Sequence, residues 1–431
     1  MAASPSVGSE PDGRLVLDRL RELPGGPELI ALAAGRDDVE LVGGAVRDVL
    51  LGREPRELDV TVTGSSQALA ERLATELGAR PVEAHERFGT AVVRWDGGRI
   101  DIATRRSERY PAPGALPDVG PGSRESDRLR RDFTVNTLAV ALSGPGAGRL
   151  DGAPGALEDL RGRRLRVLHE ASFRDDPTRL LRLARYSARL GFRVEERTAA
   201  LATEAVDGGA LDTVSSARVG AELRLALAEP DPVAALGALD GLGVLAALHE
   251  AIAFEEPLTR AALDELPRED GAWPDVLLLA SLLLPHDDYD AHDYETRLRV
   301  LLDGFELPAA ERERTVHSAL LAPRLAARLH DANAGPPSAI YAVAHDAPLE
   351  ALALAAALAG ARGQAAAADA ARRWLSELRH VRLEIGGEEL LAAGVGPGPE
   401  VGRRLRRALL RKLDGEVGGR EQELAAALED A

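Results

Sequence analysis

The stretch GGAVRDVLLGREPRELDV, residues 43–60, places a pair of glycines between segments of different periodicity. VELVG before the pair predicts a strand, VRDVLLG after it predicts a helix, and LDVTVTG predicts a second strand. Two glycines at a strand-to-helix turn let the backbone approach a phosphate closely, and the first turn of the helix offers free N–H groups. Arg47 adds a cation one turn into that helix. A glycine pair alone usually marks an ordinary turn, so its meaning depends on the strands around it.

Acidic residues line one face of the strand that follows. Strand alternation puts Glu57, Asp59 and Thr61 on one side, with the apolar residues between them facing the core. A later strand, RIDIAT at residues 99–104, places Asp101 between two core isoleucines. Two carboxylates at i and i+2 and a third on a neighbouring strand can hold two divalent cations about 3.5–4 Å apart, and such oxygen ligands suit Mg²⁺. Ordinary exposed strand positions are the alternative, but the glycine turn upstream favours a metal site.

The periodicity of the chain changes from mixed to helical. Short strands and helices alternate from residue 39 to 104, and the Pro- and Gly-rich stretch YPAPGALPDVGPGS at 110–123 predicts a loop. From residue 172 onward the pattern is helical. We therefore predict an α+β fold with four parts: a disordered N-terminal tail (1–13), an α/β head (14–168), a helical neck (169–230), and a helical body and tail (231–431).

Composition bounds the class of protein. The chain has 431 residues, of which 45% are hydrophobic, as expected for a globular protein of about two to four domains. It contains no cysteine, which excludes disulfides and thiolate metal sites and suits a reducing cytoplasm. The first residues lack the pattern of a secretory signal. The longest apolar runs are shorter than the roughly 20 residues that cross a bilayer. We therefore predict a cytoplasmic protein with no membrane partner and make no prediction of its oligomeric state.

The net charge of −17 argues, taken alone, against a nucleic-acid partner. Its distribution is uneven, because residues 1–230 carry 33 basic and 36 acidic side chains, whereas residues 231–431 carry 20 and 34. Residues 121–200 contain 16 arginines against 11 acids, and residues 401–413 contain six basic side chains and no acid. Phosphate binding requires only local cation density. A solvated basic helix face explains 401–413 equally well.

A row of arginines marks the start of the helical region. Those at 179, 182, 185 and 189 fall within an arc of about 120° on a helix. An amphipathic helix with a solvated arginine face is the simpler explanation. However, Asp176 precedes Arg179 by about one turn. Such a pair can present an acceptor and a planar donor fork, which together mimic a Watson–Crick edge.

These motifs resemble, in order, those of one family. The stretch at 43–60 is similar to the signature of class II tRNA nucleotidyltransferases and bacterial poly(A) polymerases, within the DNA polymerase beta-like superfamily. RIDIATRRSERY fits its third-carboxylate strand and RRDFTVNTLAV at 130–140 its ribose-recognition motif. SFRDDPTRLLRLARYSARLGF at 172–192 is similar to its base-selecting motif. The resemblance implies a polymerase beta-like nucleotidyltransferase head followed by an all-helical neck, body and tail. It also implies CTP, ATP and tRNA as substrates and Mg²⁺ as the cofactor.

The resemblance implies a role for each matching residue. The catalytic metal ligands would be Glu57, Asp59 and Asp101. The residues that hold the triphosphate and ribose or order their site would be Gly43, Gly44, Arg47, Arg131, Asp132 and Asn136. Asp176 and Arg179 would read the incoming C or A, while Arg182 and Arg185 would contact phosphate or primer.

The chain departs from the family pattern at one metal ligand, and its motifs are compatible with several activities. The family usually has Asp where this chain has Glu57, whose longer arm changes the geometry available to an octahedral Mg²⁺. Addition of the whole CCA end, of CC or A alone, and poly(A) synthesis are all compatible with the motifs. A catalytically weak tRNA-binding paralogue is the alternative from another class. The segment HDDYDAHD at 286–293 lacks a second His/Asp cluster, so we do not predict a metal site there.

Overall fold

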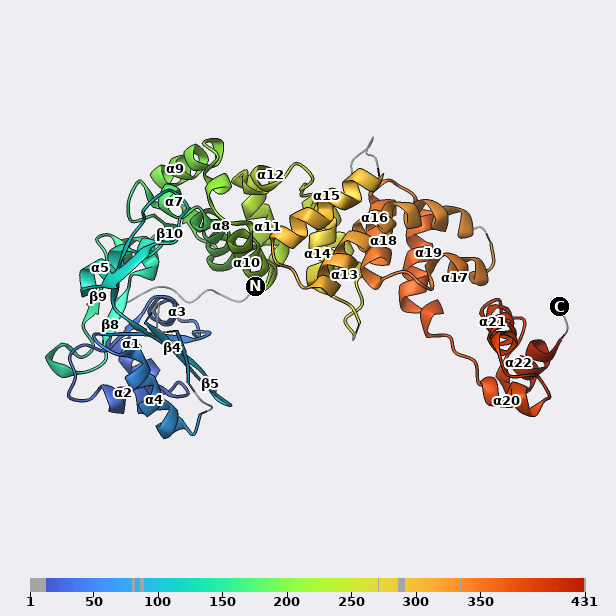
Figure 1. Cartoon of the computed structure of the whole chain (residues 1–431), viewed down its shortest axis with the longest axis horizontal. Coiled ribbons are helices and arrows are strands. Elements are labelled where there is room, and N and C mark those ends of the chain that lie inside the picture. The colour runs from blue at the N-terminus through green and yellow to red at the C-terminus, as the bar shows by residue number, and fades with distance from the viewer. Residues whose placement is uncertain are drawn as a thin grey trace. The chain divides into compact units, whose positions relative to one another are not determined.

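The computed structural model describes residues 13–79, 82–85, 89–269, 271–285, 291–333 and 335–429. It divides into two compact units, residues 1–215 and 216–431. Figure 1 shows that the first contains sheet and helices and the second only helices, which confirms the predicted α+β fold. The division falls inside the predicted neck, and the four-part organisation stays a prediction. The N-terminal tail predicted at 1–13 lies outside the described residues except for Gly13.

A mixed sheet forms the base of the first unit. In the described part of the chain it has seven strands in the order β3-β4-β5-β2-β1-β8-β9. Their bounds are β1 Glu40–Val42, β2 Leu58–Val62, β3 Glu83–His85, β4 Thr90–Trp95, β5 Gly98–Thr104, β8 Ala139–Ala141 and β9 Leu150–Asp151. Within this sheet β2 and β5 pair in parallel and their neighbours pair antiparallel. The predicted strands around the acidic residues are therefore confirmed.

Helices flank this sheet and continue beyond it. They are α1 Gly13–Leu20, α2 Gly26–Ala33, α3 Gly44–Leu50, α4 Ser66–Leu77, α5 Arg124–Leu129, α6 Ala156–Arg161, α7 Ser172–Asp175, α8 Thr178–Leu190 and α9 Glu196–Asp207. The core face of β2 consists of Leu58, Val60 and Val62, all at most 5% exposed, as alternation predicts. Two short strands, β10 Arg164–Leu165 and β11 Arg193–Val194, pair in parallel before and after α8.

The loop predicted at 110–123 is wrong over its second half. Residues Asp118–Pro121 form β7, which pairs antiparallel with β6, Arg106–Arg109. The stretch is therefore a hairpin whose connection spans residues 110–117. A proline is tolerated here because β7 belongs to a two-stranded sheet and Pro121 is its last residue, where no N–H is required for the ladder.

The second unit is helical throughout its described residues. Its helices are α10 Ser216–Leu227, α11 Pro232–Gly241, α12 Val244–Leu248, α13 Glu256–Glu265, α14 Pro274–Leu282, α15 Ala291–Gly304, α16 Ala309–Ala332, α17 Pro337–Ala344, α18 Leu349–Ala361, α19 Ala365–Ser376, α20 Gly387–Ala392, α21 Pro399–Leu413 and α22 Gly419–Leu428. The nearly all-apolar α18 packs among α13, α16 and α19. No single helix in the described ranges is long and apolar enough to cross a membrane, and α17 and α18 reach that length only as a pair bent by 119°.

Candidate active site

Two carboxylates meet on neighbouring strands. Asp59 of β2 and Asp101 of β5 are register partners in the parallel pair, and the isoleucines on either side of Asp101 face the core. Burial, together with the negative charges of Glu57 and Asp101, raises the pKa of Asp59 to about 7. Ionised Asp59 is therefore unfavourable in this site, and a bound cation would offset both its burial and its repulsion by Glu57 and Asp101.

Glu57 is placed less tightly than the two aspartates. It directly precedes β2, and its side chain is 47% exposed. Among the described residues, no three acidic, histidine or cysteine side chains are already arranged around one metal position. The cation already beside these carboxylates is Arg99, whose guanidinium donates to both Asp101 oxygens, at 2.6 and 2.5 Å, and approaches Glu57 Oε2 at 3.8 Å. The three residues fit a divalent metal in donor type, and Asp59 and Asp101 also fit it in strand register, but Arg99 holds both carboxylate oxygens of Asp101 in this structure.

The glycine turn lies beside these carboxylates. Gly43 adopts φ +69°, a conformation that favours glycine, and its N–H donates to the Leu138 carbonyl at 2.9 Å. A Cβ at this position would lie 3.0 Å from Arg131 Nη1 and 3.8 Å from Asp59 Oδ2. Gly44 begins α3. The structure thus brings the turn, Arg131 and Asp59 into one site.

Arg47 points into the protein and is only 1% exposed. It donates to Asp48 Oδ1 at 2.8 Å and to Asn136 Oδ1 at 2.5 Å. A side chain this buried reaches a nucleotide only if its neighbours move. Its geometry therefore favours an indirect role, in which Arg47 fixes the amide of Asn136.

Asp132 joins the motif at residues 130–140 to α8. Its Oδ1 accepts from Asn136 Nδ2 at 2.9 Å, and its Oδ2 accepts from Arg182 Nε and Nη2 at 2.9 and 2.5 Å. Burial alone would raise the pKa of Asp132, but the charge of Arg182 and the hydrogen bonds from Asn136 and Arg182 outweigh it and lower the pKa to about 2. Asp132 is therefore an ionised internal anchor for both residues.

The arginine face of α8 is largely buried, since only Arg182 and Arg189 keep partial exposure, at 31% and 18% of their side chains, so the simpler interpretation of a solvated arginine face is wrong. Arg179 is 3% exposed and donates to Ser172 Oγ at 2.7 Å and to the Arg130 carbonyl at 2.8 Å. Arg185 is 7% exposed. Asp176 accepts from the N–H and hydroxyl of Thr178 at the start of the helix, at 3.1 and 2.6 Å. The face therefore packs against the motif at residues 130–140.

Sequence reasoning missed an aromatic residue at the centre of this packing. Arginines 47, 182 and 185 place their guanidinium carbons 5.5, 5.6 and 4.9 Å from the Tyr186 ring centroid, within the range of cation–π contacts. Phe133 meets the same ring edge-on at 5.9 Å. An aromatic residue inside an arginine-rich helix was the available signal.

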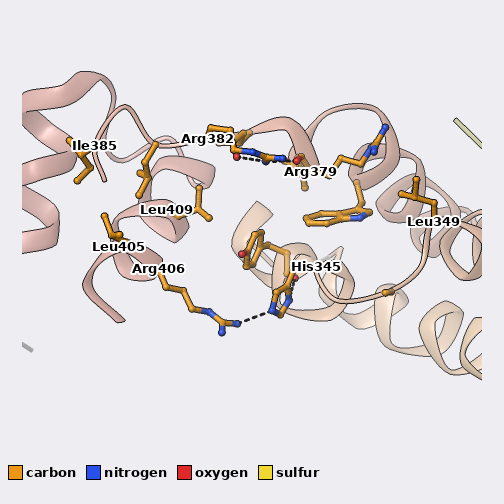
Figure 2. A pocket seen from close by; sticks show the side chains of 14 residues that line it. His345, Leu349, Arg379, Arg382, Ile385, Leu405, Arg406 and Leu409 are labelled. Carbon is orange, nitrogen blue, oxygen red and sulfur yellow. Dashed lines mark hydrogen bonds between the residues drawn. The ribbon is translucent and has the colours of Figure 1, made fainter. Parts of the chain in front are cut away.

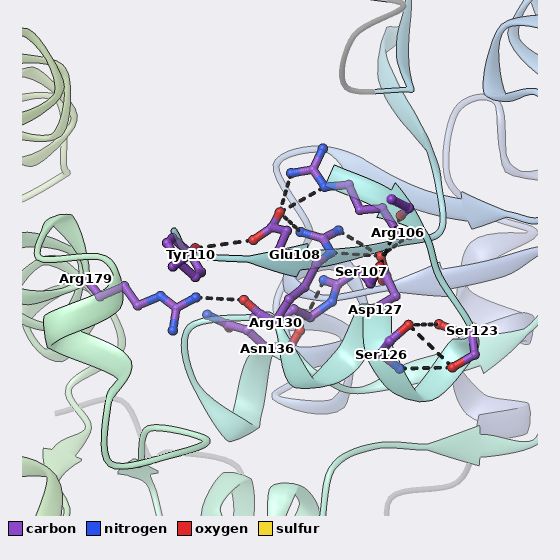
Figure 3. A network of polar contacts seen from close by, with 12 residues as sticks. Arg106, Ser107, Glu108, Tyr110, Ser123, Ser126, Asp127, Arg130, Asn136 and Arg179 are labelled. Carbon is purple, nitrogen blue, oxygen red and sulfur yellow. Dashed lines mark hydrogen bonds and ion pairs between the residues drawn. The ribbon is translucent and has the colours of Figure 1, made fainter. Parts of the chain in front are cut away.

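Figure 3 shows a second set of ion pairs, which ties the β6–β7 hairpin to the same region. Glu108 binds Arg106 and Arg130 at 2.8 and 3.2 Å, and Asp127 binds Arg130 at 2.8 Å. The Tyr110 hydroxyl donates to Glu108 at 3.3 Å, and burial is the largest of the causes that raise its pKa to about 12. Arg130 therefore links the hairpin to Arg179 through its own carbonyl.

In the second unit, the basic cluster at 401–413 is largely neutralised by nearby acids. Arg403 and Arg404 both bind Glu400 at 2.7 Å, and Lys412 binds the buried Glu423 at 2.5 Å. Arg411 likewise has acidic partners. This pairing weakens the interpretation of the cluster as a phosphate site.

A pocket of about 730 Å³ adjoins that helix, and Arg406 points across it toward His345 in Figure 2. Aromatic and basic side chains share its wall: Tyr341, Trp374, Arg379, Arg382 and Arg406. No acidic residue is among the described residues that line it. The motif at 286–293 cannot be placed in the same way, because its residues 286–290 lie outside the described part of the chain.

The chain resembles known proteins at the level of sequence. Residues 39–166 match the poly A polymerase head domain, which defines the class of the first unit. An A-adding tRNA nucleotidyltransferase of Geobacter sulfurreducens is 36% identical over 91% of this chain and 45% of that protein. A CC-adding tRNA nucleotidyltransferase of Deinococcus radiodurans is 42% identical over 49% of this chain and 55% of that protein. The chain thus spans about half the length of these curated relatives.

Solved structures match along nearly the whole chain. An apo form of a CCA-adding enzyme has a TM-score of 0.77 at 28% identity, covering 96% of this chain and 95% of that one. The Thermotoga maritima CCA-adding enzyme complexed with tRNA has a TM-score of 0.75 at 27% identity, covering 97% and 98%. These likenesses support the resemblance to the class II tRNA nucleotidyltransferase family that the motifs of the chain indicated.

Proposed function

We propose that this protein is a template-independent tRNA nucleotidyltransferase that adds C, A or both to the 3′ end of tRNA from CTP and ATP and releases pyrophosphate. The observation that carries the proposal is the meeting of Asp59, Asp101, the Gly43 turn and Arg131 in one site. The names of the relatives, A-adding and CC-adding, support the choice of substrate. Related CCA-adding enzymes in complex with ATP and with CTP support the choice of nucleotides.

Mg²⁺ is the metal that these donors fit, with Glu57, Asp59 and Asp101 as its ligands. When bound, two such ions would lower the pKa of the attacking 3′-hydroxyl and neutralise the departing pyrophosphate. The raised pKa of Asp59 supports this assignment, because a cation would relieve the repulsion among the three carboxylates. Glu57 lies in a bend just before β2. Its side chain, which is one methylene longer than that of aspartate, would therefore have to reach the metal from outside the strand.

The remaining site residues would position the nucleotide. The backbone of Gly43 and Gly44 would approach the triphosphate, with Arg131 as the nearest cation. Asp132 would hold Arg182 and Asn136 in place for the ribose. Positioning of this kind supplies much of the rate in nucleotidyl transfer, because the reacting groups are brought together in the required orientation.

Base choice would depend on Asp176 and Arg179, which lie at the start of α8. Together they would offer an acceptor and a planar donor group to the Watson–Crick edge of the incoming base, which, as for Arg47, requires the neighbours of the buried Arg179 to move. The contacts of Arg179 with Ser172 and the Arg130 carbonyl would fix the plane of its guanidinium. Arg182 and Arg185 would contact phosphate or primer, so side chains would replace a nucleic-acid template.

The second unit would bind the tRNA away from its 3′ end. Its pocket combines aromatic side chains with Arg379, Arg382 and Arg406, a composition suited to an RNA backbone and exposed bases. Filter binding of Arg382→Ala and Arg406→Ala tests this contact. Weaker binding with a reduced salt dependence would support it, and unchanged binding would contradict it.

Product sizing tests the reaction and distinguishes its variants. The protein is incubated with Mg²⁺ and with tRNA that lacks the CCA end, tRNA that ends in CC, or complete tRNA, and with CTP and ATP separately and together. Full, CC-only and A-only enzymes give different ladders, and a long A tail would indicate poly(A) synthesis. No extension of any tRNA that the protein binds would contradict the enzymatic proposal and support a tRNA-binding paralogue.

A further inference from the structure

We propose that Arg99 is an internal counter-ion of the active site that competes with the divalent metal for the carboxylate of Asp101. The inference rests on the proposed metal site and adds to it a residue that sequence reasoning did not identify. It makes metal affinity, in the absence of nucleotide, depend on a residue that is not itself a ligand.

The geometry of Arg99 carries the first step. It lies two residues before Asp101 on β5 and therefore on the same face of the sheet. Its Nε and Nη2 donate to the two carboxylate oxygens at 2.6 and 2.5 Å. This forked arrangement is the strongest form of an Arg–carboxylate pair, and it uses both oxygens of the proposed metal ligand. Its remaining nitrogen, Nη1, lies 3.8 Å from Glu57 Oε2.

The electrostatics of the site give the second step. Arg99 and Arg131 both lie beside the proposed metal ligands: Arg99 binds Asp101 and approaches Glu57, and Arg131 Nη1 lies 3.0 Å from the position of a Gly43 Cβ that would itself be 3.8 Å from Asp59 Oδ2. Arg131 also binds Asp127 at 3.3 Å and the Asn136 carbonyl at 3.3 Å. The hydrogen bonds and ion pairs of the Arg99 side chain, in contrast, are all with the proposed metal ligands Asp101 and Glu57. It is therefore the cation whose position is coupled most directly to these carboxylates.

Competition follows from these two facts. A metal that coordinates Asp101 takes an oxygen that the Arg99 fork uses, so the fork must open. The side chain of Arg99 is 37% exposed, which leaves it room to turn away. Metal binding then loses the free energy of the Arg99–Asp101 pair and encounters a nearby positive charge. Removing the guanidinium should remove both penalties.

The sheet supplies a matched control for the effect of charge alone. Arg94 of β4 is the register partner of Arg99 and shares its face. Arg94 pairs instead with Glu83, at 3.7 Å, and its side chain is 48% exposed. Arg99→Met and Arg94→Met therefore make the same change of charge on neighbouring strands, but only the first removes a contact with Asp101.

The experiment measures Mn²⁺ binding to the full-length protein, stripped of metal and without nucleotide, from the electron paramagnetic resonance signal of free Mn²⁺. We expect Arg99→Met to bind about tenfold more tightly than the wild type and Arg94→Met to stay within about twofold. Arg99→Gln provides a second uncharged variant in case methionine perturbs folding, and Arg99→Lys should give a smaller gain because it keeps the charge without the fork.

Equal affinity of Arg99→Met and wild type, or an equal gain in Arg94→Met, would overturn the role of Arg99. Asp59→Ala separates this failure from that of the metal site itself. If Asp59→Ala no longer binds Mn²⁺ but Arg99→Met binds it as the wild type does, the metal site is supported and competition by Arg99 is contradicted. If Mn²⁺ binds none of the variants, or binds Asp59→Ala normally, both proposals are wrong.

Discussion

Asp59→Asn should stabilise the protein in the absence of metal, although it removes a residue proposed to be essential. The pKa of Asp59 is raised from 3.8 to about 7, and each unit corresponds to about 1.4 kcal/mol of differential interaction. Ionised Asp59 therefore destabilises the first unit by at most about 4 kcal/mol relative to a neutral side chain. We expect Asp59→Asn to recover about 2–4 kcal/mol above pH 7, because solvent at the edge of the site reduces the full value.

The pH dependence has a definite sign. Between pH 3.8 and about 7 the folded state keeps the Asp59 proton while the unfolded state has lost it, so the stability of the wild type falls as the pH rises through this window. Asn does not titrate. The advantage of Asp59→Asn should therefore be largest above pH 7 and disappear near pH 4.

Hydrogen exchange of peptides that cover β2 and β5, measured in EDTA, reports the opening free energy of this unit separately from the second unit. Glu83→Gln is the control, because it neutralises an exposed carboxylate of the same sheet and should change stability by less than about 0.5 kcal/mol. Saturating Mg²⁺ should stabilise the wild type and leave Asp59→Asn unchanged. If Asp59→Asn is no more stable than the wild type at pH 8, ionised Asp59 does not destabilise the first unit.

Three further substitutions test the positioning of the nucleotide. Gly43→Ala places a Cβ at a residue with φ +69° and 3.0 Å from Arg131 Nη1. We therefore expect a loss of stability of about 1–3 kcal/mol and at least a tenfold fall in kcat/KM. Kinetics equal to those of the wild type would contradict the placement of Gly43 in the active site. Asp132→Asn removes a carboxylate whose pKa is held at about 2, so it should lower the opening free energy measured at pH 7 by about 2–3 kcal/mol. The control Asp151→Asn changes a more exposed ion pair and should lower it by less than about 1 kcal/mol. Equal losses in the two variants would contradict the role of Asp132 as an internal anchor. Arg179→Ala should change the ratio of kcat/KM for CTP to that for ATP about tenfold or more while chemistry is partly retained, and an unchanged ratio would remove this residue from base choice.

The fold was largely predictable because its signals are local. The alternation around Asp59 and Asp101 identified two strands, and the periodicity after residue 172 identified the mainly helical part of the chain, but not the boundary at residue 216 between the two units. The strand Asp118–Pro121 was missed because its composition favours a loop, and only pairing with Arg106–Arg109 makes it extended. Such pairing is a non-local contact that the segment itself does not encode.

The site was predictable in its members but not in their environment. Helical spacing placed four arginines on one face of α8, but it could not tell that the motif at 130–140 covers this face and buries Arg179. In the same way, nothing in the order of residues distinguished Arg47 as a buried anchor from a surface cation. The role of Arg99 was not predicted, because a basic residue two positions before an acid is common on strands. Only the parallel pairing of β5 with β2, which carries Asp59, places Arg99 among the proposed metal ligands.

The rate of nucleotide incorporation by Asp59→Ala tests the proposed metal-dependent nucleotidyl transfer most directly. Single-turnover assays with labelled CTP and ATP, Mg²⁺, and tRNA lacking its terminal nucleotides compare this variant with the wild type and with Glu83→Gln. We expect Mg²⁺-dependent incorporation by the wild type and Glu83→Gln, and a loss of more than about 1,000-fold for both nucleotides in Asp59→Ala, with tRNA binding retained. Incorporation by Asp59→Ala at a rate near that of the wild type would contradict the proposed metal-dependent transfer.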